Sequence, residues 1–184
     1  MVEAILGAST RVFVKSGYAH ATTNKIAEAA GVSVGSLYQY FPSKDAIAVE
    51  LLRRYRERLV SVVGDALGSA DEKTFPAAVH TLISALLRAE GINPALHRVL
   101  IEQVLRTNAR GELIGFEEKL ESVVADALRR AKGQVGVADL HLASFVVVRV
   151  VLAMVHAAVV DRPAINQPAL ADELTRLVLR YLAP

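Results

Sequence analysis

The chain has 184 residues and contains neither cysteine nor tryptophan. Without cysteine it can form no disulfide, no thiolate metal site and no cysteine nucleophile. Aromatic residues make up only 5%, and the dominance of Ala, Val and Leu favours closely packed helices over an aromatic-rich β-sandwich. The chain also lacks a large excess of either charge, since 21 basic and 19 acidic side chains leave +2. That balance is too mild to indicate a nucleic-acid partner by itself.

Hydrophobic residues account for 53% of the chain and charged residues for 22%, which excludes a disordered polymer. An apolar run at residues 142–160 is long enough to raise the question of a membrane span. However, Arg149 lies near its middle, where a charge would cost about 2.5–3.5 kcal/mol at a bilayer centre. Residues 1–17 carry Glu3 and Arg11 and do not resemble a signal peptide. We therefore expect a soluble, cytoplasmic protein in which the run is a buried helix or a subunit contact.

Apolar periodicity, together with Gly, Pro and capping residues, predicts eight or nine helices and no sheet. The β-branched run 145–151 could form a strand on propensity alone. Its long context without turn signals favours a helix. The predicted helices cover about residues 2–15, 23–30, 34–40, 44–67, 76–91, 94–108, 111–132, 138–160 and 168–182.

The most informative segment is residues 22–44, TTNKIAEAAGVSVGSLYQYFPSK. Ala27 is small enough for two helices to cross closely, and Gly31 can take the positive φ that a tight turn requires. The apolar seam between these two helices comes from Ile26, Ala30, Val32 and Leu37. The pattern predicts a helix-turn-helix, whose second helix enters the DNA major groove.

The second helix of this pair presents hydroxyl and amide groups without negative charge, from Ser33, Ser36, Tyr38, Gln39 and Tyr40. Thr23 and Lys44 stand at helix starts, where free backbone N–H groups favour phosphate. Asn24 and Gln39 could pair bidentately with adenine. Residues 1–52 hold four basic and four acidic side chains. Such a neutral module would depend on dimerisation more than on counterion release.

Residues 13–47, FVKSGYAHATTNKIAEAAGVSVGSLYQYFPSKDAI, resemble the TetR-type transcriptional repressors. The resemblance lies in GY before the threonine pair, IA..AGVS, G-S-LY-YF, and FPSK followed by an acidic residue. It implies a three-helix DNA-binding domain joined to a larger helical domain for ligand binding and dimerisation. It also implies DNA contacts from Val34, Gly35, Ser36, Tyr38, Gln39 and Tyr40, and phosphate or nearby base contacts from Thr23, Asn24, Lys25 and Lys44. No basic arm precedes the first predicted helix, so we expect no extra minor-groove contact.

Five residues are candidates for a ligand pocket: His97, Glu102, Phe116, Phe145 and Met154. The first two belong to a polar stripe that could form a cavity wall, although a solvated helix face with i,i+4 ion pairs explains the same spacing. The other three could line an apolar pocket or belong to ordinary core. The five histidines of the chain show no paired metal spacing, and we expect neither a metal nor a cofactor.

Two apolar stripes at helical spacing are candidates for a dimer interface. One consists of Val148, Leu152, Val155 and Val159, and the other of Leu174, Leu177, Val178 and Tyr181. Two such helices from each of two subunits would form a four-helix bundle, an arrangement that the resemblance also implies. Burial of both stripes within one chain is the alternative.

Together these features predict an all-α protein with a helix-turn-helix DNA-binding domain at residues 1–46 and a helical ligand-binding and dimerisation domain at 47–184. The predicted function is a homodimeric transcriptional regulator. By resemblance it is a repressor that a small-molecule effector releases from a palindromic double-stranded DNA operator. We expect no enzymatic activity, because the sequence shows no nucleophile–base pair, metal cluster or phosphate loop. The alternative is a helical scaffold or enzyme that does not bind DNA.

Overall fold

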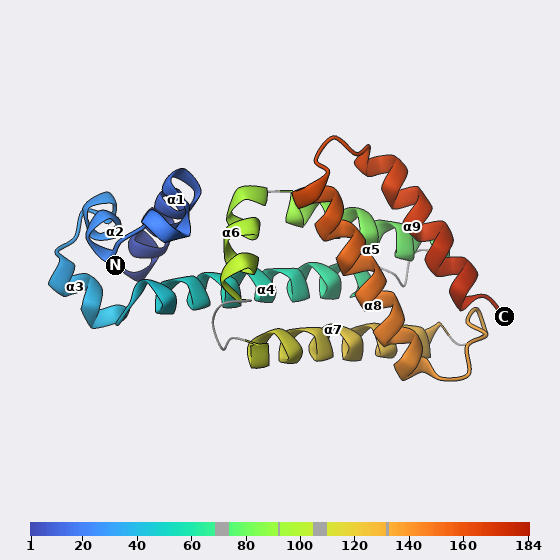
Figure 1. The fold of residues 1–184 in the computed structure, drawn as a ribbon. Helices are drawn as coiled ribbons and strands as arrows, with labels where there is room; N and C mark the ends of the chain where they lie inside the picture. Colours follow the sequence, from blue (N-terminus) through green and yellow to red (C-terminus); the bar gives the residue numbers. More distant parts are fainter. Residues whose placement is uncertain (69–73, 92, 105–109, 132) are drawn as a thin grey trace. The chain divides into compact units, whose positions relative to one another are not determined.

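The computed structural model describes all residues except 69–73, 92, 105–109 and 132 (Figure 1). The described residues form helices and no strand, as predicted, and the run 145–151 is helical. The α-helices are α1 (Val2–His20), α2 (Thr23–Ala30), α3 (Val34–Tyr40), α4 (Lys44–Gly68), α5 (Phe75–Glu90), α6 (Pro94–Val104), α7 (Arg110–Arg130), α8 (Leu140–His156) and α9 (Gln167–Leu182). A π-helical turn, η2 (Ala157–Asp161), follows α8.

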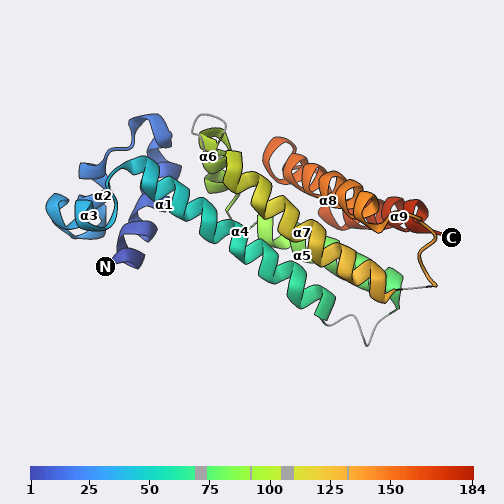
Figure 2. The same ribbon diagram turned by 90° about the horizontal axis from the view of Figure 1, so that it is seen from below.

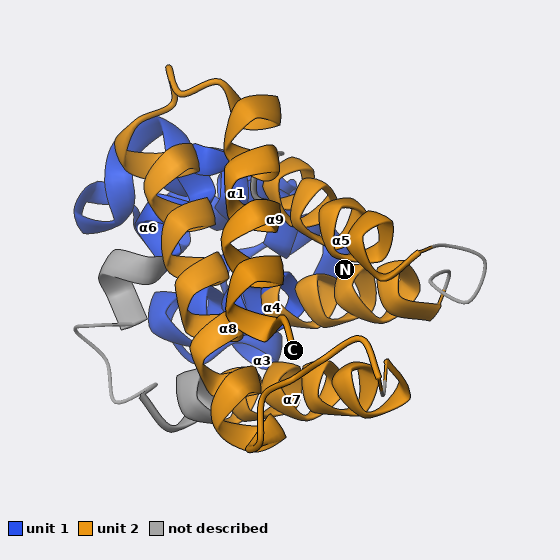
Figure 3. Cartoon of the chain, turned by 90° about the vertical axis from the view of Figure 1, so that its right-hand side faces the viewer, with its two compact units in different colours: residues 1–55, 93–112 blue, residues 56–92, 113–184 orange. Residues whose placement is uncertain are grey.

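Packing divides the chain into two compact units, which are coloured separately in Figure 3. Unit 1 comprises Met1–Tyr55 and Asn93–Glu112, and unit 2 comprises Arg56–Ile92 and Leu113–Pro184. Unit 1 therefore includes α6, which packs against α1 although it lies far along the chain. The sequence predicted a boundary between a DNA-binding domain and a ligand-binding domain at residues 46 and 47. The two packing units do not test that division by function, so it stays a prediction.

Unit 1 is built on α1, which packs against α2 as well as α6, while α2 packs against α3. Phe13, Ile26 and Leu37 are completely buried at its core. Burial of each such side chain contributes about 1.5–3 kcal/mol. The sequence predicted that the first helix ends at Lys15, whereas α1 reaches His20. Gly17 nevertheless interrupts it with a φ of 71°, because glycine readily adopts this conformation.

Unit 2 is a helical layer in which α5 packs against α8 and α9, and α8 packs against α9. Figures 1 and 2 both show α8 and α9 side by side. The segment Leu140–Asp161 is long and apolar enough to cross a membrane by composition alone. One side of it packs inside unit 2, where Val148, Val151 and Val155 are buried.

Candidate nucleic-acid interface and apolar cavity

The helices α2 and α3 are joined by a turn whose geometry follows from its sequence. Thr22 caps α2, because its hydroxyl oxygen accepts a hydrogen bond from the backbone N–H of Lys25 at 3.3 Å. Gly31 ends α2 in the left-handed conformation with a φ of 69°. Ser33 then caps α3, with its hydroxyl oxygen 3.0 Å from the backbone nitrogen of Ser36. The two helices and their turn lie where the sequence predicted them.

One face of α3 is anchored in unit 1 and the opposite face is free. Leu37 is completely buried, and Phe41, directly after the helix, is 8% exposed. The outward side chains include Tyr38 at 50% and Tyr40 at 47% exposure. The exposed residues of the helix are Val34, Gly35, Tyr38, Gln39 and Tyr40, while Ser36 is half-buried. Most residues of the predicted recognition helix are therefore exposed.

The start of α2 lies next to this surface. The hydroxyl oxygens of Thr23 and Tyr38 are 3.1 Å apart, which links the first turn of α2 to α3. Each hydroxyl keeps further hydrogen-bonding capacity. Asn24 and Lys25, in the same first turn, are exposed. Free N–H groups at a helix start favour phosphate. The start of α2 therefore suits a contact with the phosphate backbone of DNA, beside the predicted recognition face of α3.

The two lysines predicted to meet phosphate are both held by backbone carbonyls within unit 1. The ammonium of Lys25 donates to the carbonyl oxygen of His20 at 3.0 Å. The ammonium of Lys44 donates to the carbonyl oxygens of Tyr18 at 2.9 Å and Ala21 at 3.1 Å. An ammonium has three N–H donors, so Lys25 retains two for another acceptor and Lys44 retains one. Lys44 therefore ties the end of α1 to the start of α4.

Tyr18 strengthens this tie and was absent from the predicted site residues. Its hydroxyl donates to the carboxylate of Asp45, at the start of α4. Burial, followed by the bond and charge of Asp45, raises the pKa of Tyr18 well above its ordinary value. The hydroxyl consequently remains a donor throughout the physiological range. The available sequence signal was the GY pair before the threonines.

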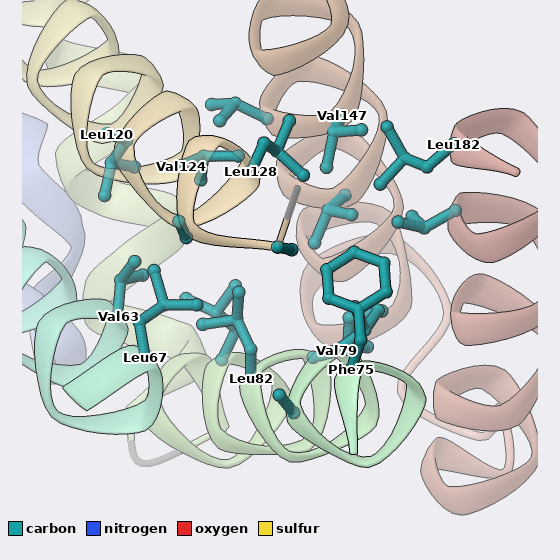
Figure 4. A pocket seen from close by; sticks show the side chains of 18 of the residues that line it. Val63, Leu67, Phe75, Val79, Leu82, Leu120, Val124, Leu128, Val147 and Leu182 are labelled. Atoms are coloured by element: carbon teal, nitrogen blue, oxygen red, sulfur yellow. The ribbon is translucent and has the colours of Figure 1, made fainter. Parts of the chain in front are cut away.

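Unit 2 contains a cavity of about 280 Å³ lined by α4, α5, α7, α8 and α9 (Figure 4). The lining residues are Val, Leu, Ile, Ala and Phe, apart from Arg130 and Gln134. Figure 4 shows hydrocarbon side chains from several helices pointing toward a common space; those labelled are Val63, Leu67, Phe75, Val79, Leu82, Leu120, Val124, Leu128, Val147 and Leu182. The volume is near the lower end of the range for small-molecule pockets.

The residues predicted for a ligand pocket lie elsewhere. His97 belongs to unit 1 and is buried, with its Nδ1 atom 2.6 Å from the hydroxyl oxygen of Tyr55. The ring of Phe116 lies 5.8 Å from the guanidinium carbon of Arg56. Neither predicted residue lines the cavity.

Phe145 and Met154 are 45% and 41% exposed on α8 and do not line the cavity either. The side chain of Glu102 lies outside the described residues. These positions stand out in the sequence because they carry polar, aromatic or sulfur-containing side chains in an aliphatic chain. The cavity is built from the common aliphatic residues, which carry no such signal.

Most of the predicted dimer stripe is buried within a single chain. The completely or nearly buried members are Val148, Val155, Val159, Leu174 and Val178. Of the predicted residues, Val148, Leu152 and Val178 line the cavity, while Leu177 and Tyr181 are 49% and 39% exposed. Large apolar side chains that are exposed on these two helices are Leu142, Phe145, Met154, Leu177 and Tyr181; we call them the outer apolar residues. The five buried residues are therefore buried within one chain, which was the alternative to a dimer interface.

A helix-turn-helix joined to helices that surround an apolar cavity defines the class of helical DNA-binding regulators. Residues 5–51 match the family model described as "Bacterial regulatory proteins, tetR family". Residues 74–182 match the one described as "Tetracyclin repressor-like, C-terminal domain". The chain belongs to the TetR family of transcriptional regulators, which confirms the resemblance seen in residues 13–47.

A curated relative is the nucleoid occlusion factor SlmA of Actinobacillus pleuropneumoniae, 27% identical over 121 residues, which are 64% of this chain and 59% of that protein. The chain thus spans about three fifths of the length of the curated relative it matches. A TetR-family regulator from Mesorhizobium loti has a TM-score of 0.81 at 18% identity, with 100% of this chain and 96% of that chain covered. The regulator FadR from Bacillus subtilis in complex with stearoyl-CoA has a TM-score of 0.71 at 21% identity, with 97% and 98% covered. These likenesses show that the fold extends over nearly the whole chain.

Proposed function

We propose that this protein is a homodimeric, cytoplasmic repressor that leaves a palindromic operator when the apolar part of a small molecule enters the cavity of unit 2. The observation that carries the proposal is the outward face of α3. Leu37 anchors the helix from within, while Tyr38, Gln39 and Tyr40 are exposed and uncovered by the described residues of unit 1.

In this proposal α3 lies in the major groove with its N-terminal residues foremost. Gln39 reads a base edge through its amide, and Gly35 permits close approach of the backbone. Of the bonded hydroxyls of Thr23 and Tyr38, the one that accepts within the pair still has its own hydrogen and donates it to a phosphate oxygen at the start of α2. Lys25 supplies its two remaining donors to the same strand. Lys44 acts mainly by holding the start of α4 in place.

The outer apolar residues support dimerisation. They place exposed hydrocarbon on both α8 and α9, which pack against each other. A second copy that covers these side chains would remove them from water, and a dimer carries two copies of α3. Half-sites one helical turn apart, about 34 Å, would then be read together. Because the N-terminal module is nearly neutral, two copies compensate for weak binding by one.

The cavity supports a ligand-responsive role, and the solved complex of a protein with the same fold and stearoyl-CoA is consistent with it. An effector releases DNA only if it binds the free protein more tightly than the operator-bound protein. Equal effector affinity for the two states, measured by titration calorimetry, would contradict release.

Footprinting of DNA upstream of the gene, at two salt concentrations, tests the proposal. We expect a protected palindrome with two half-sites. Gln39→Ala should weaken binding about fivefold to 150-fold, which is about 1–3 kcal/mol for one bidentate base contact. Gln167→Ala, at the start of α9 in unit 2, is the matched control and should bind as the original protein does. Absence of protection at low salt, or equal binding by both variants, would contradict the assignment.

A further inference from the structure

We propose that the effector is an extended aliphatic molecule with an anionic group at one end. The hydrocarbon chain fills the cavity of unit 2, and the anion pairs with Arg130 at its mouth. This inference rests on the proposed function, because it names the ligand class for the cavity assigned there.

The walls of the cavity exclude ligands that are polar along their length. Apart from Arg130 and Gln134, the described lining residues have hydrocarbon side chains. A hydroxyl or amide buried among them would lose its hydrogen bonds to water and find no side-chain partner, at a cost of several-fold to a hundredfold in affinity for each group. Phe75 is the one aromatic side chain among the described lining residues, so a flat cation would find no aromatic cage.

The cavity is also long for its volume. Its lining residues extend from Phe75 to Leu86 on α5 and from Leu120 to Arg130 on α7. At a rise of 1.5 Å per residue, each span is about 15 Å along the helix axis. Figure 4 shows Leu120 and Val63 toward one end and Phe75 toward the other. A volume of about 280 Å³ over such a length suits an extended chain better than a fused ring system.

The polar groups are confined to one end. Arg130 is the last residue of α7, beyond Leu128, and Gln134 follows in the next segment; both are exposed. Arg130 is the one charged residue among the described residues that line the cavity.

The guanidinium of Arg130 is available to a ligand. The neighbouring Arg129 forms an ion pair with Asp126, whereas Arg130 forms none with the residues that the structure describes. A guanidinium suits bidentate binding of a carboxylate or phosphate. An anionic group bound there would remain partly hydrated and avoid the penalty of burying a charge.

Two sources could supply this chemistry: a free fatty carboxylate, or an acyl chain on a phosphate-bearing thioester such as coenzyme A. Titration calorimetry on the full chain without DNA tests both. The probes are octanoate, decanoate, dodecanoate, decanoyl-CoA and, as the uncharged comparison, 1-decanol. We expect each added methylene to tighten binding about fourfold, or about 0.8 kcal/mol, until the chain exceeds the cavity. Whichever of decanoate and decanoyl-CoA binds with the lower Kd shows whether the effector is a free fatty carboxylate or an acyl thioester. No binding by either, or affinity independent of chain length, would overturn the inference.

The variant Arg130→Gln tests the anionic end. It should weaken decanoate binding about fivefold, or about 1 kcal/mol for an exposed ion pair, and leave 1-decanol unchanged. Arg129→Gln is the matched control, because Arg129 does not line the cavity, and should change neither ligand. Ala127→Leu, which adds volume to the lining, should weaken dodecanoate more than octanoate. If Arg130→Gln weakens both ligands equally or neither, Arg130 does not bind the anion.

Titrating the same ligands into the operator complex separates this inference from the proposed function. If decanoate binds the free protein as described but does not release the operator, the ligand class stands and the release mechanism is wrong. If a protected palindrome is observed but no carboxylate or acyl thioester binds, the protein is a DNA-binding regulator as proposed, and the proposed class of effector is wrong.

Discussion

Replacing Gly35 by alanine separates the stability of α3 from its contact with DNA. Gly35 is the second residue of α3 and is exposed. A Cβ at this position would lie 3.9 Å from the hydroxyl oxygen of Ser33, an ordinary van der Waals contact. The substitution therefore introduces no clash within the chain. Because alanine loses less backbone entropy than glycine in a helix, the free energy of unfolding should rise by about 0.5–1 kcal/mol.

The effect of Gly35→Ala on DNA binding should have the opposite sign. If the N-terminal end of α3 enters the major groove, the added methyl group occupies space that the DNA needs. We expect operator affinity to fall about tenfold, equivalent to about 1.4 kcal/mol. A more stable protein that binds DNA less tightly cannot be explained by partial unfolding, so the two measurements together identify a contact.

Urea denaturation followed by circular dichroism measures the first quantity, and fluorescence anisotropy with labelled operator measures the second. Gly64→Ala is the matched control: Gly64 lies inside α4, and a Cβ there meets nothing within 4 Å. It should gain similar stability and bind the operator unchanged. If Gly35→Ala binds as tightly as the original protein, the N-terminal end of α3 does not approach DNA closely and the reasoning is refuted.

Three further substitutions test the module and its electrostatics. Ser33→Ala removes the cap of α3 and should lower the free energy of unfolding by about 1 kcal/mol; an unchanged urea midpoint would contradict this. Hydrogen bonds, the strongest of them from Arg53, lower the pKa of Glu50 from 4.5 to about 2. The ionised carboxylate therefore adds to the free energy of unfolding above pH 4.5, and this contribution declines as the pH falls toward 2. Glu50→Gln should accordingly cost about 1 kcal/mol at neutral pH and progressively less in acid, and a pH-independent cost in urea denaturation would argue against the shift. Lys25→Gln should reduce the slope of log affinity against log salt by about one, as measured by anisotropy at several salt concentrations; an unchanged slope would mean that Lys25 makes no phosphate contact.

The amino-acid sequence alone was sufficient for the helical class and for the helix-turn-helix. The signals there are local. Thr22 and Ser33 bond backbone N–H groups three residues away, and Gly31 adopts a left-handed conformation that its own lack of a side chain permits. Leu37 is the large aliphatic residue at the middle of this short helix, and it is completely buried. Such features depend on a few neighbouring residues, and their spacing specifies the element and its exposed face.

Tertiary structure decided which apolar stripe of each long helix faces inward and where the cavity lies. The helix α8 is apolar on several sides, so sequence periodicity alone did not show that Val148 and Val155 would be buried while Leu142 and Phe145 would be exposed. Likewise, Lys44 had an evident charge but its partners are backbone carbonyls distant in sequence, which no residue pattern reveals. A cavity is the space left between helices, so it depends on packing rather than on any one residue type.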